Sequence, residues 1–72
     1  MSARPMHRVL LVGAGGVGRK RAAAIAAHDC TRLVAVCDVD ESSASGLADD
    51  YGVAAVTDWS AAVRDVDADL VI

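Results

Sequence analysis

The residues best suited to chemistry lie in the stretch VGAGGVGRKR, positions 12–21, where glycines recur at positions 13, 15 and 18. This G-x-G-x-x-G spacing is typical of a loop that holds the pyrophosphate of a dinucleotide. Gly13 permits a tight turn, Gly15 lets a pyrophosphate approach the backbone, and Gly18 lets the following helix pack closely on the preceding strand. The free N–H groups and positive dipole end of that helix attract the phosphates. The predicted site takes in the whole loop: Gly13, Ala14, Gly15, Gly16, Val17 and Gly18.

The acidic partner that such a loop requires is Asp38, twenty positions after Gly18. A carboxylate there can accept hydrogen bonds from both hydroxyls of the adenosine ribose. It would repel a 2′-phosphate, and the next residue, Val39, carries no positive charge that could pair with one. The sequence therefore predicts NAD rather than NADP, with Asp38 and Val39 in the site. The alternative is a glycine turn that merely joins a strand to a helix.

Three consecutive cations, Arg19, Lys20 and Arg21, follow the loop. Positive charge opposes the dipole at a helix start and costs about 0.3–1 kcal/mol for each exposed charge. A bound pyrophosphate would offset that cost, and we expect Arg19 to contact the cofactor. For Lys20 and Arg21 a solvated basic turn is the simpler interpretation. Cations near the adenosine could also support the phosphate of NADP, which opposes the prediction drawn from Asp38.

Other residues with reactive or aromatic side chains are interpreted as structural. Cys37 lies in the apolar run LVAVC, which predicts a buried thiol. Trp59 and Tyr51 fall on the apolar faces of their helices and are expected to pack in the core. The alternating acids of residues 65–69, DVDAD, are compatible with a metal site, but solvated turn acids are commoner.

Strands and helices alternate along the chain. Short apolar runs bounded by turn residues predict buried strands, and apolar residues three and four apart predict helices that cover them. Asp40 and Asp58 are placed to cap helix starts, and Gly52 to end a helix. The expected strands are 8–12, 32–38, 53–56 and a last one in DADLVI; the expected helices are 16–28, 40–51 and one that Asp58 caps.

This order of elements predicts the α/β class. The crossovers are long enough for parallel pairing, and right-handed crossovers build a Rossmann-type doubly wound parallel sheet. The expected strand order is 3-2-1-4, a partial Rossmann sheet. Because the chain stops inside an apolar strand, we expect residues 1–72 to be the N-terminal part of a dinucleotide-binding domain, with a substrate domain not present in this chain.

Composition excludes several classes of partner. The net charge is −3 at pH 7, whereas proteins that bind the phosphate backbone of nucleic acids carry a basic surplus. No stretch approaches the roughly 20 apolar residues of a membrane span, and the start MSARPMHR does not lead into a signal peptide. We therefore expect a cytoplasmic protein without nucleic-acid or membrane partners.

Three stretches resemble the N-terminal domain of the Gfo/Idh/MocA oxidoreductases: VLLVGAGGVGRKRAAAI, LVAVCDVDESSASGLADDYGV and VTDWSAAVRDVDADLVI. The resemblance implies an NAD(P)-dependent oxidoreductase, a dehydrogenase that transfers hydride to or from a sugar, cyclitol or related polyol. It assigns the dinucleotide loop to Gly13, Gly15 and Gly18 and the ribose acid to Asp38. Many members have histidine where this chain has Arg21. The family's catalytic Glu-Lys-Pro segment, and the second domain that forms the substrate site and the homo-oligomer interface, have no counterpart in residues 1–72.

Two other interpretations remain open at this point. An NAD-sensing regulatory module without catalysis would carry the same loop and acid, although the YGV and TDW stretches fit such modules less well. A third interpretation concerns the 72 residues alone, which could lack activity and a stable fold because the last strand would be an exposed edge.

Overall fold

Strands and helices alternate strictly in the computed structural model, which describes residues 6–72. The strands are β1 (His7–Val12), β2 (Thr31–Cys37), β3 (Ala54–Val56) and β4 (Leu70–Val71), and the helices are α1 (Gly16–Ala27), α2 (Glu41–Tyr51) and α3 (Trp59–Asp65). Each predicted element is present, with ends within a few residues of those expected. None of the described helices is long and apolar enough to cross a membrane.

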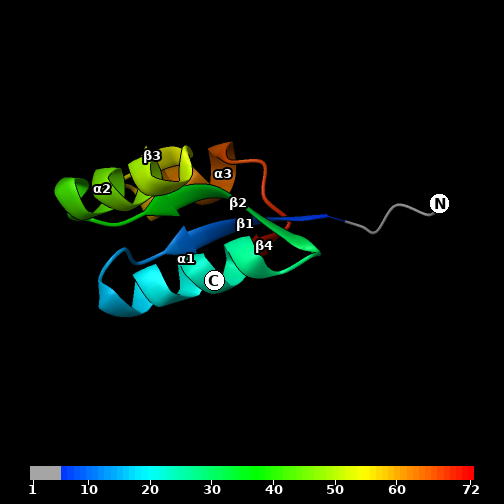
Figure 1. The fold of residues 1–72 in the computed structure, drawn as a ribbon. Coiled ribbons are helices and arrows are strands. Elements are labelled where there is room, and N and C mark those ends of the chain that lie inside the picture. Colours follow the sequence, from blue (N-terminus) through cyan, green and yellow to red (C-terminus); the bar gives the residue numbers. More distant parts are fainter. Residues whose placement is uncertain (1–5) are drawn as a thin grey trace.

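The strands form one parallel sheet in the order β3-β2-β1-β4, which confirms the predicted Rossmann-type topology. Figure 1 shows the strands in the middle of the molecule, with α1 on one side and α3 on the other. The chain reverses its direction of winding after β3, because β4 pairs with β1 on the far side from β2. Ligands of open parallel sheets bind at the carboxyl ends of the strands beside this reversal.

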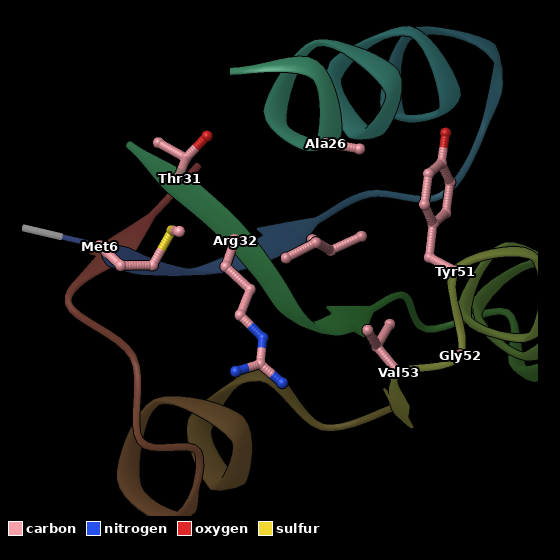
Figure 2. A pocket seen from close by; sticks show the side chains of 8 residues that line it. Met6, Ala26, Thr31, Arg32, Tyr51, Gly52 and Val53 are labelled. Atoms are coloured by element: carbon pink, nitrogen blue, oxygen red, sulfur yellow. The ribbon is translucent and has the colours of Figure 1, made fainter. Parts of the chain in front are cut away.

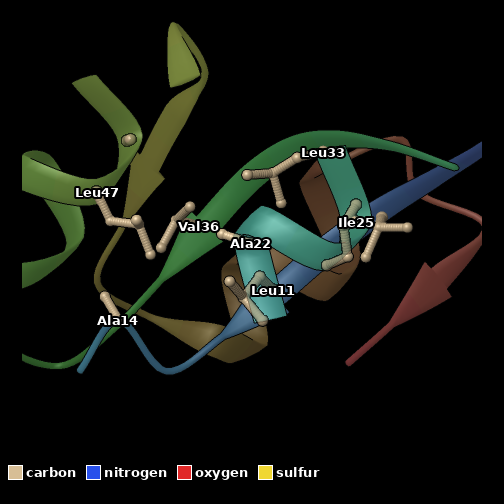
Figure 3. Packing of buried hydrophobic residues seen from close by; sticks show 9 residues of the cluster. Leu11, Ala14, Ala22, Ile25, Leu33, Val36 and Leu47 are labelled. Atoms are coloured by element: carbon tan, nitrogen blue, oxygen red, sulfur yellow. The ribbon is translucent and has the colours of Figure 1, made fainter. Parts of the chain in front are cut away.

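Both faces of β1 are buried, as expected for a central parallel strand. Leu11 packs with residues of α1 and α2, whereas its neighbour Leu10 packs with Ala62 of α3, because successive side chains of a strand point to opposite faces. Figure 3 shows the first of these two clusters. Its buried members are Val9, Leu11, Ala14, Ala22, Ile25, Leu33, Val36, Leu47 and Ala48.

Side chains cap two of the helices, as the sequence predicts. The Asp40 carboxylate accepts hydrogen bonds from the N–H of Ser42 at 3.3 Å and from the hydroxyl of Ser43 at 2.7 Å. Gly52 ends α2 with φ of 66°, in the left-handed region that favours glycine. The Asp58 carboxylate caps α3 by accepting hydrogen bonds from two backbone N–H groups in the first turn of that helix. By contrast, α1 begins after Gly15, which has no side chain to satisfy its first N–H groups.

The prediction that Trp59 packs in the core is wrong, since its side chain is 61% exposed. Asp58 starts α3 immediately after the loop that follows β3, so Trp59 lies in the first turn, beside the carboxyl ends of β1 and β2. Only Ala62 of this helix is buried, and Val63 is exposed. Tyr51 is half-buried and does pack against the core.

Two of the alternating acids form an ion-pair cluster with Arg8 rather than pointing freely into solvent. The backbone N–H of Arg8 donates to Asp69 at 2.9 Å, and its guanidinium donates to Asp69 at 3.2 Å and also contacts Asp67. In return, the N–H of Asp69 donates to the carbonyl of Arg8 at 2.7 Å. This cluster joins the start of β4 to the start of β1. Within residues 6–72, no group of three or more His, Cys, Asp or Glu side chains could hold a metal ion.

Replacing Asp69 by asparagine should destabilise the chain in a pH-dependent way. Hydrogen bonds from the side chain and backbone of Arg8 lower the pKa of Asp69. A lowered folded pKa means that the carboxylate stabilises the fold above the ordinary aspartate pKa of about 3.9 and loses that effect as pH falls through the folded value. Urea unfolding of Asp69→Asn should therefore show a lower midpoint at pH 7, and the difference from the unsubstituted chain should shrink below about pH 4.

The matched control is Asp65→Asn, because Asp65 contacts only the neighbouring Arg64 among the ion pairs described and both side chains are exposed. This substitution should change the midpoint little at any pH. An equal loss of stability from Asp69→Asn at pH 7 and pH 3 would contradict the ion-pair account.

Candidate dinucleotide-binding site

The loop after β1 lies close to two other parts of the backbone, the end of β2 and the first turn of α1. Gly13 has φ of +102°, a conformation that side-chain-bearing residues rarely adopt. Its N–H donates to the carbonyl of Cys37 at 2.8 Å, which holds the loop against the end of β2. A Cβ on Gly18 would lie 2.0 Å from the carbonyl oxygen of Gly13, so only glycine allows α1 to approach the loop this closely.

The outer side of the same loop is open. A Cβ on Gly15 or Gly16 would meet no atom within 4 Å, and both residues are exposed. The start of α1 has no side-chain cap, and the first N–H groups of an α-helix have no partner within the helix. Gly15, Gly16 and Val17 therefore present an uncapped helix start to solvent. These features fit a pyrophosphate, which needs room beside the backbone and donors to bind.

Asp38 lies directly beside the loop, because Val12 and Cys37 are partners in the register of β1 and β2. One carboxylate oxygen accepts a hydrogen bond from the N–H of Ala14 at 2.8 Å, and the other accepts one from the N–H of Asp40 at 2.9 Å. The hydrogen bonds from Asp40 and Ala14 lower the pKa of Asp38, so its carboxylate is charged at neutral pH. A carboxylate has about four lone-pair positions, so each oxygen can still accept a ribose hydroxyl.

The bridge from Asp38 to Ala14 was missed by sequence reasoning, which assigned Asp38 only to the ribose. The signal for it is weak in the sequence, since it joins residues 24 positions apart. It gives Asp38 a second role, because the carboxylate holds the glycine loop in place without any ligand.

Arg19 turns toward α2. Its guanidinium lies 3.0 Å from the carboxylate of Asp50 and passes over Gly46, where a Cβ would lie 3.6 Å from it. Both partners of this ion pair are more than half exposed. The pairing offsets part of the charge that opposes the helix dipole. A contact between Arg19 and a cofactor stays a prediction, as does the solvated basic turn for Lys20 and Arg21, which are both exposed.

A cavity of ≈ 210 Å³ opens beside Asp38. Its lining includes Val39 and Trp59, which are 91% and 61% exposed. Cys37 also lines it, and burial, with a smaller effect of nearby Asp38, raises the pKa of this thiol. A raised pKa leaves the thiol protonated and unreactive at neutral pH, in agreement with the prediction of a buried structural cysteine.

A larger cavity of ≈ 320 Å³ lies away from the glycine loop (Figure 2). Thr31 and Arg32 from the start of β2 line it, together with Ala26 near the end of α1 and Tyr51 at the end of α2. These positions belong to the amino-terminal edge of the sheet. Because open parallel sheets bind ligands at the carboxyl edge, we assign the site to the smaller cavity and the loop beside it.

Two glycine substitutions should separate folding from binding. Gly18→Ala drives a methyl group into the carbonyl of Gly13, and we expect it to lower the free energy of unfolding by about 3 kcal/mol or more. Gly15→Ala places its methyl group in open space, so stability should change by less than about 0.5 kcal/mol. The same methyl group would obstruct a pyrophosphate and should weaken NAD binding about tenfold or more.

Urea unfolding measures the first effect and calorimetric titration with NAD the second. A Gly15→Ala variant that is as unstable as Gly18→Ala, or that binds NAD as the unsubstituted chain does, would contradict this assignment of the two glycines.

Comparisons with known proteins agree with this geometry. The model of a family described as "Oxidoreductase family, NAD-binding Rossmann fold" (GFO_IDH_MocA) matches residues 7–72. Among curated proteins no sequence matches. A myo-inositol dehydrogenase from Corynebacterium glutamicum is similar in structure, with 33% identity, a TM-score of 0.84, and coverage of 92% of this chain and 20% of that one.

Two further solved structures are similar. A putative myo-inositol dehydrogenase from Sinorhizobium meliloti 1021 has 35% identity and a TM-score of 0.83. The WlbA dehydrogenase from Bordetella pertussis, solved in complex with NADH and UDP-GlcNAcA, has 27% identity and a TM-score of 0.85. Each comparison covers 92% of this chain and 20% of the other, so the chain spans about a fifth of the length of these proteins. Because the family match extends over residues 7–72, the chain belongs to the GFO_IDH_MocA oxidoreductase family and has its NAD-binding Rossmann fold.

Proposed function

We propose that this chain holds the cofactor of an NAD-dependent dehydrogenase that acts on a sugar, a cyclitol or a related polyol. The observation that carries the proposal is the arrangement of Asp38 beside the uncapped start of α1, which offers an acceptor for ribose and donors for phosphate at one edge of the sheet. The solved relatives include inositol dehydrogenases and a dehydrogenase crystallised with NADH and UDP-GlcNAcA, which supports this substrate class.

In the proposed complex, the backbone from Gly13 to Gly18 binds the pyrophosphate, and Asp38 accepts hydrogen bonds from the ribose hydroxyls. The exposed Val39 follows Asp38 and lies against the adenosine. When bound, the nicotinamide supplies the hydride acceptor or donor of the reaction. The residues of this chain bind and orient the cofactor, and we assign no catalytic residue within residues 6–72.

The charges around Asp38 support NAD over NADP. Asp38 is ionised, and Asp40 and Glu41 add negative charge after β2, so a 2′-phosphate would meet repulsion. Arg19, the cation expected from the sequence to contact the cofactor, is engaged with Asp50 on α2.

The family match favours catalysis over an NAD-sensing module. We propose a homo-oligomeric parent protein that binds small sugar-like substrates and acts in the cytoplasm. This part of the proposal rests on the resemblance to whole dehydrogenases rather than on contacts within residues 6–72.

Turnover tests the proposal directly. The full-length protein, incubated with NAD and a panel of cyclitols, aldoses and nucleotide sugars, should reduce NAD with at least one of them, as followed by the near-ultraviolet absorbance of reduced nicotinamide. Saturable NAD binding without turnover on any member of the panel would support the sensing module instead, and no NAD binding would contradict both.

Asp38→Ser should change the choice between the two cofactors. Loss of hydrogen bonds to a charged group should weaken NAD binding about tenfold or more. Removal of the negative charge should at the same time raise the affinity for NADP relative to NAD. Calorimetric titrations with both cofactors measure this ratio, and Asp58→Ser, which changes a helix cap near the same edge, is the control. An unchanged ratio would contradict the role of Asp38.

A further inference from the structure

The Trp59 side chain lies at the carboxyl edge of the sheet, and neither the glycine loop nor Asp38 explains why it is exposed there. It is the single tryptophan of the chain and remains 61% exposed, although α3 belongs to a helix layer that packs on the sheet. Val39, which lines the same cavity, is 91% exposed. Exposed apolar side chains that gather around a hollow mark binding sites in many proteins.

We infer that Trp59 and Val39 form the walls of the adenine subsite and that Trp59 stacks on the adenine ring. This inference deepens the proposed function and depends on it. The base is attached to the ribose carbon next to the 2′-hydroxyl, so a ribose bound to Asp38 must place adenine within a few ångströms of that carboxylate. The cavity that meets this condition is lined by Val12, Gly13, Cys37, Asp38, Val39, Thr57 and Trp59.

The surfaces next to Asp38 differ in chemistry, and this difference indicates on which of them the adenine ring lies. On the side of α2 lie the cap residue Asp40 with its partner Ser43, and Glu41 in the first turn, which form a polar, acidic surface. The cavity beside Asp38 is different, because Val39, Trp59 and the uncharged thiol of Cys37 line it. A flat, uncharged aromatic base matches this cavity rather than the acidic surface.

The size of the cavity agrees with this occupant. Pockets that enclose a whole drug-sized ligand measure about 300–1,000 Å³. The space beside Trp59 measures ≈ 210 Å³, which suits one ring system of a dinucleotide, while the pyrophosphate lies outside it along the loop. An aromatic side chain is the usual platform for a nucleic-acid base because every base has a π-face.

The test compares Trp59→Ala and Trp59→Phe in the full-length protein, with ADP-ribose and nicotinamide mononucleotide as separate probes of the two ends of NAD. Trp59→Ala should weaken binding of NAD and ADP-ribose by about tenfold, the loss expected for one base stack. Trp59→Phe should recover most of that affinity, and binding of nicotinamide mononucleotide should not change in either variant.

The matched control is Val63→Ala, because Val63 is exposed on the same helix and does not line the cavity. It should leave all affinities unchanged, and thermal unfolding without ligand should show that the variants fold alike. If Trp59→Ala binds ADP-ribose as tightly as the unsubstituted protein, or weakens only nicotinamide mononucleotide, the adenine assignment is overturned. If the unsubstituted protein binds neither NAD nor ADP-ribose, the proposed function fails as well, so the two failures are distinguishable.

Discussion

The hydrogen bond from the N–H of Ala14 to the carboxylate of Asp38 is the interaction on which the site depends. It joins the loop after β1 to the end of β2, and the N–H of Gly13 reinforces it by donating to the carbonyl of Cys37. The loop can approach β2 because Gly13 adopts a positive φ, and α1 can approach the loop because Gly18 has no Cβ. A negative charge is thereby held next to an uncapped helix start before any ligand arrives.

Charges of both signs lie close to the start of α1, and two of them are paired or hydrogen-bonded in a way that leaves the helix start open. The start of α1 attracts anions, yet Asp38 places a carboxylate beside it, and Arg19, Lys20 and Arg21 place cations in its first turns. Asp38 is stabilised by two backbone N–H groups, and Arg19 is paired with Asp50. The donors of the helix start are left for a phosphate, while the carboxylate retains acceptor positions for hydroxyl groups. Among the cations of the run GRKR, Arg19 is explained by its ion pair with Asp50 of α2.

The fold could be predicted because its signals are local. Apolar runs, the caps Asp40 and Asp58, and Gly52 after α2 place each element to within a few residues, and short crossovers leave few alternatives to the order 3-2-1-4. The errors concern contacts that depend on three-dimensional placement. The helical pattern predicts a core position for Trp59 because such a pattern does not tell where the sheet beneath the helix ends. The pairing of Arg8 with Asp69 joins residues 61 positions apart, and no local sequence pattern predicts it.

The central claim is that NAD binds with its pyrophosphate on the loop from Gly13 to Gly18 and its ribose on Asp38. A crystal structure of the full-length protein with NADH tests it most directly. The account predicts phosphate oxygens within hydrogen-bonding distance of the backbone N–H groups at the start of α1, and ribose hydroxyls within hydrogen-bonding distance of Asp38. A cofactor bound instead in the cavity beside Thr31 and Arg32, with the glycine loop unoccupied, would contradict it.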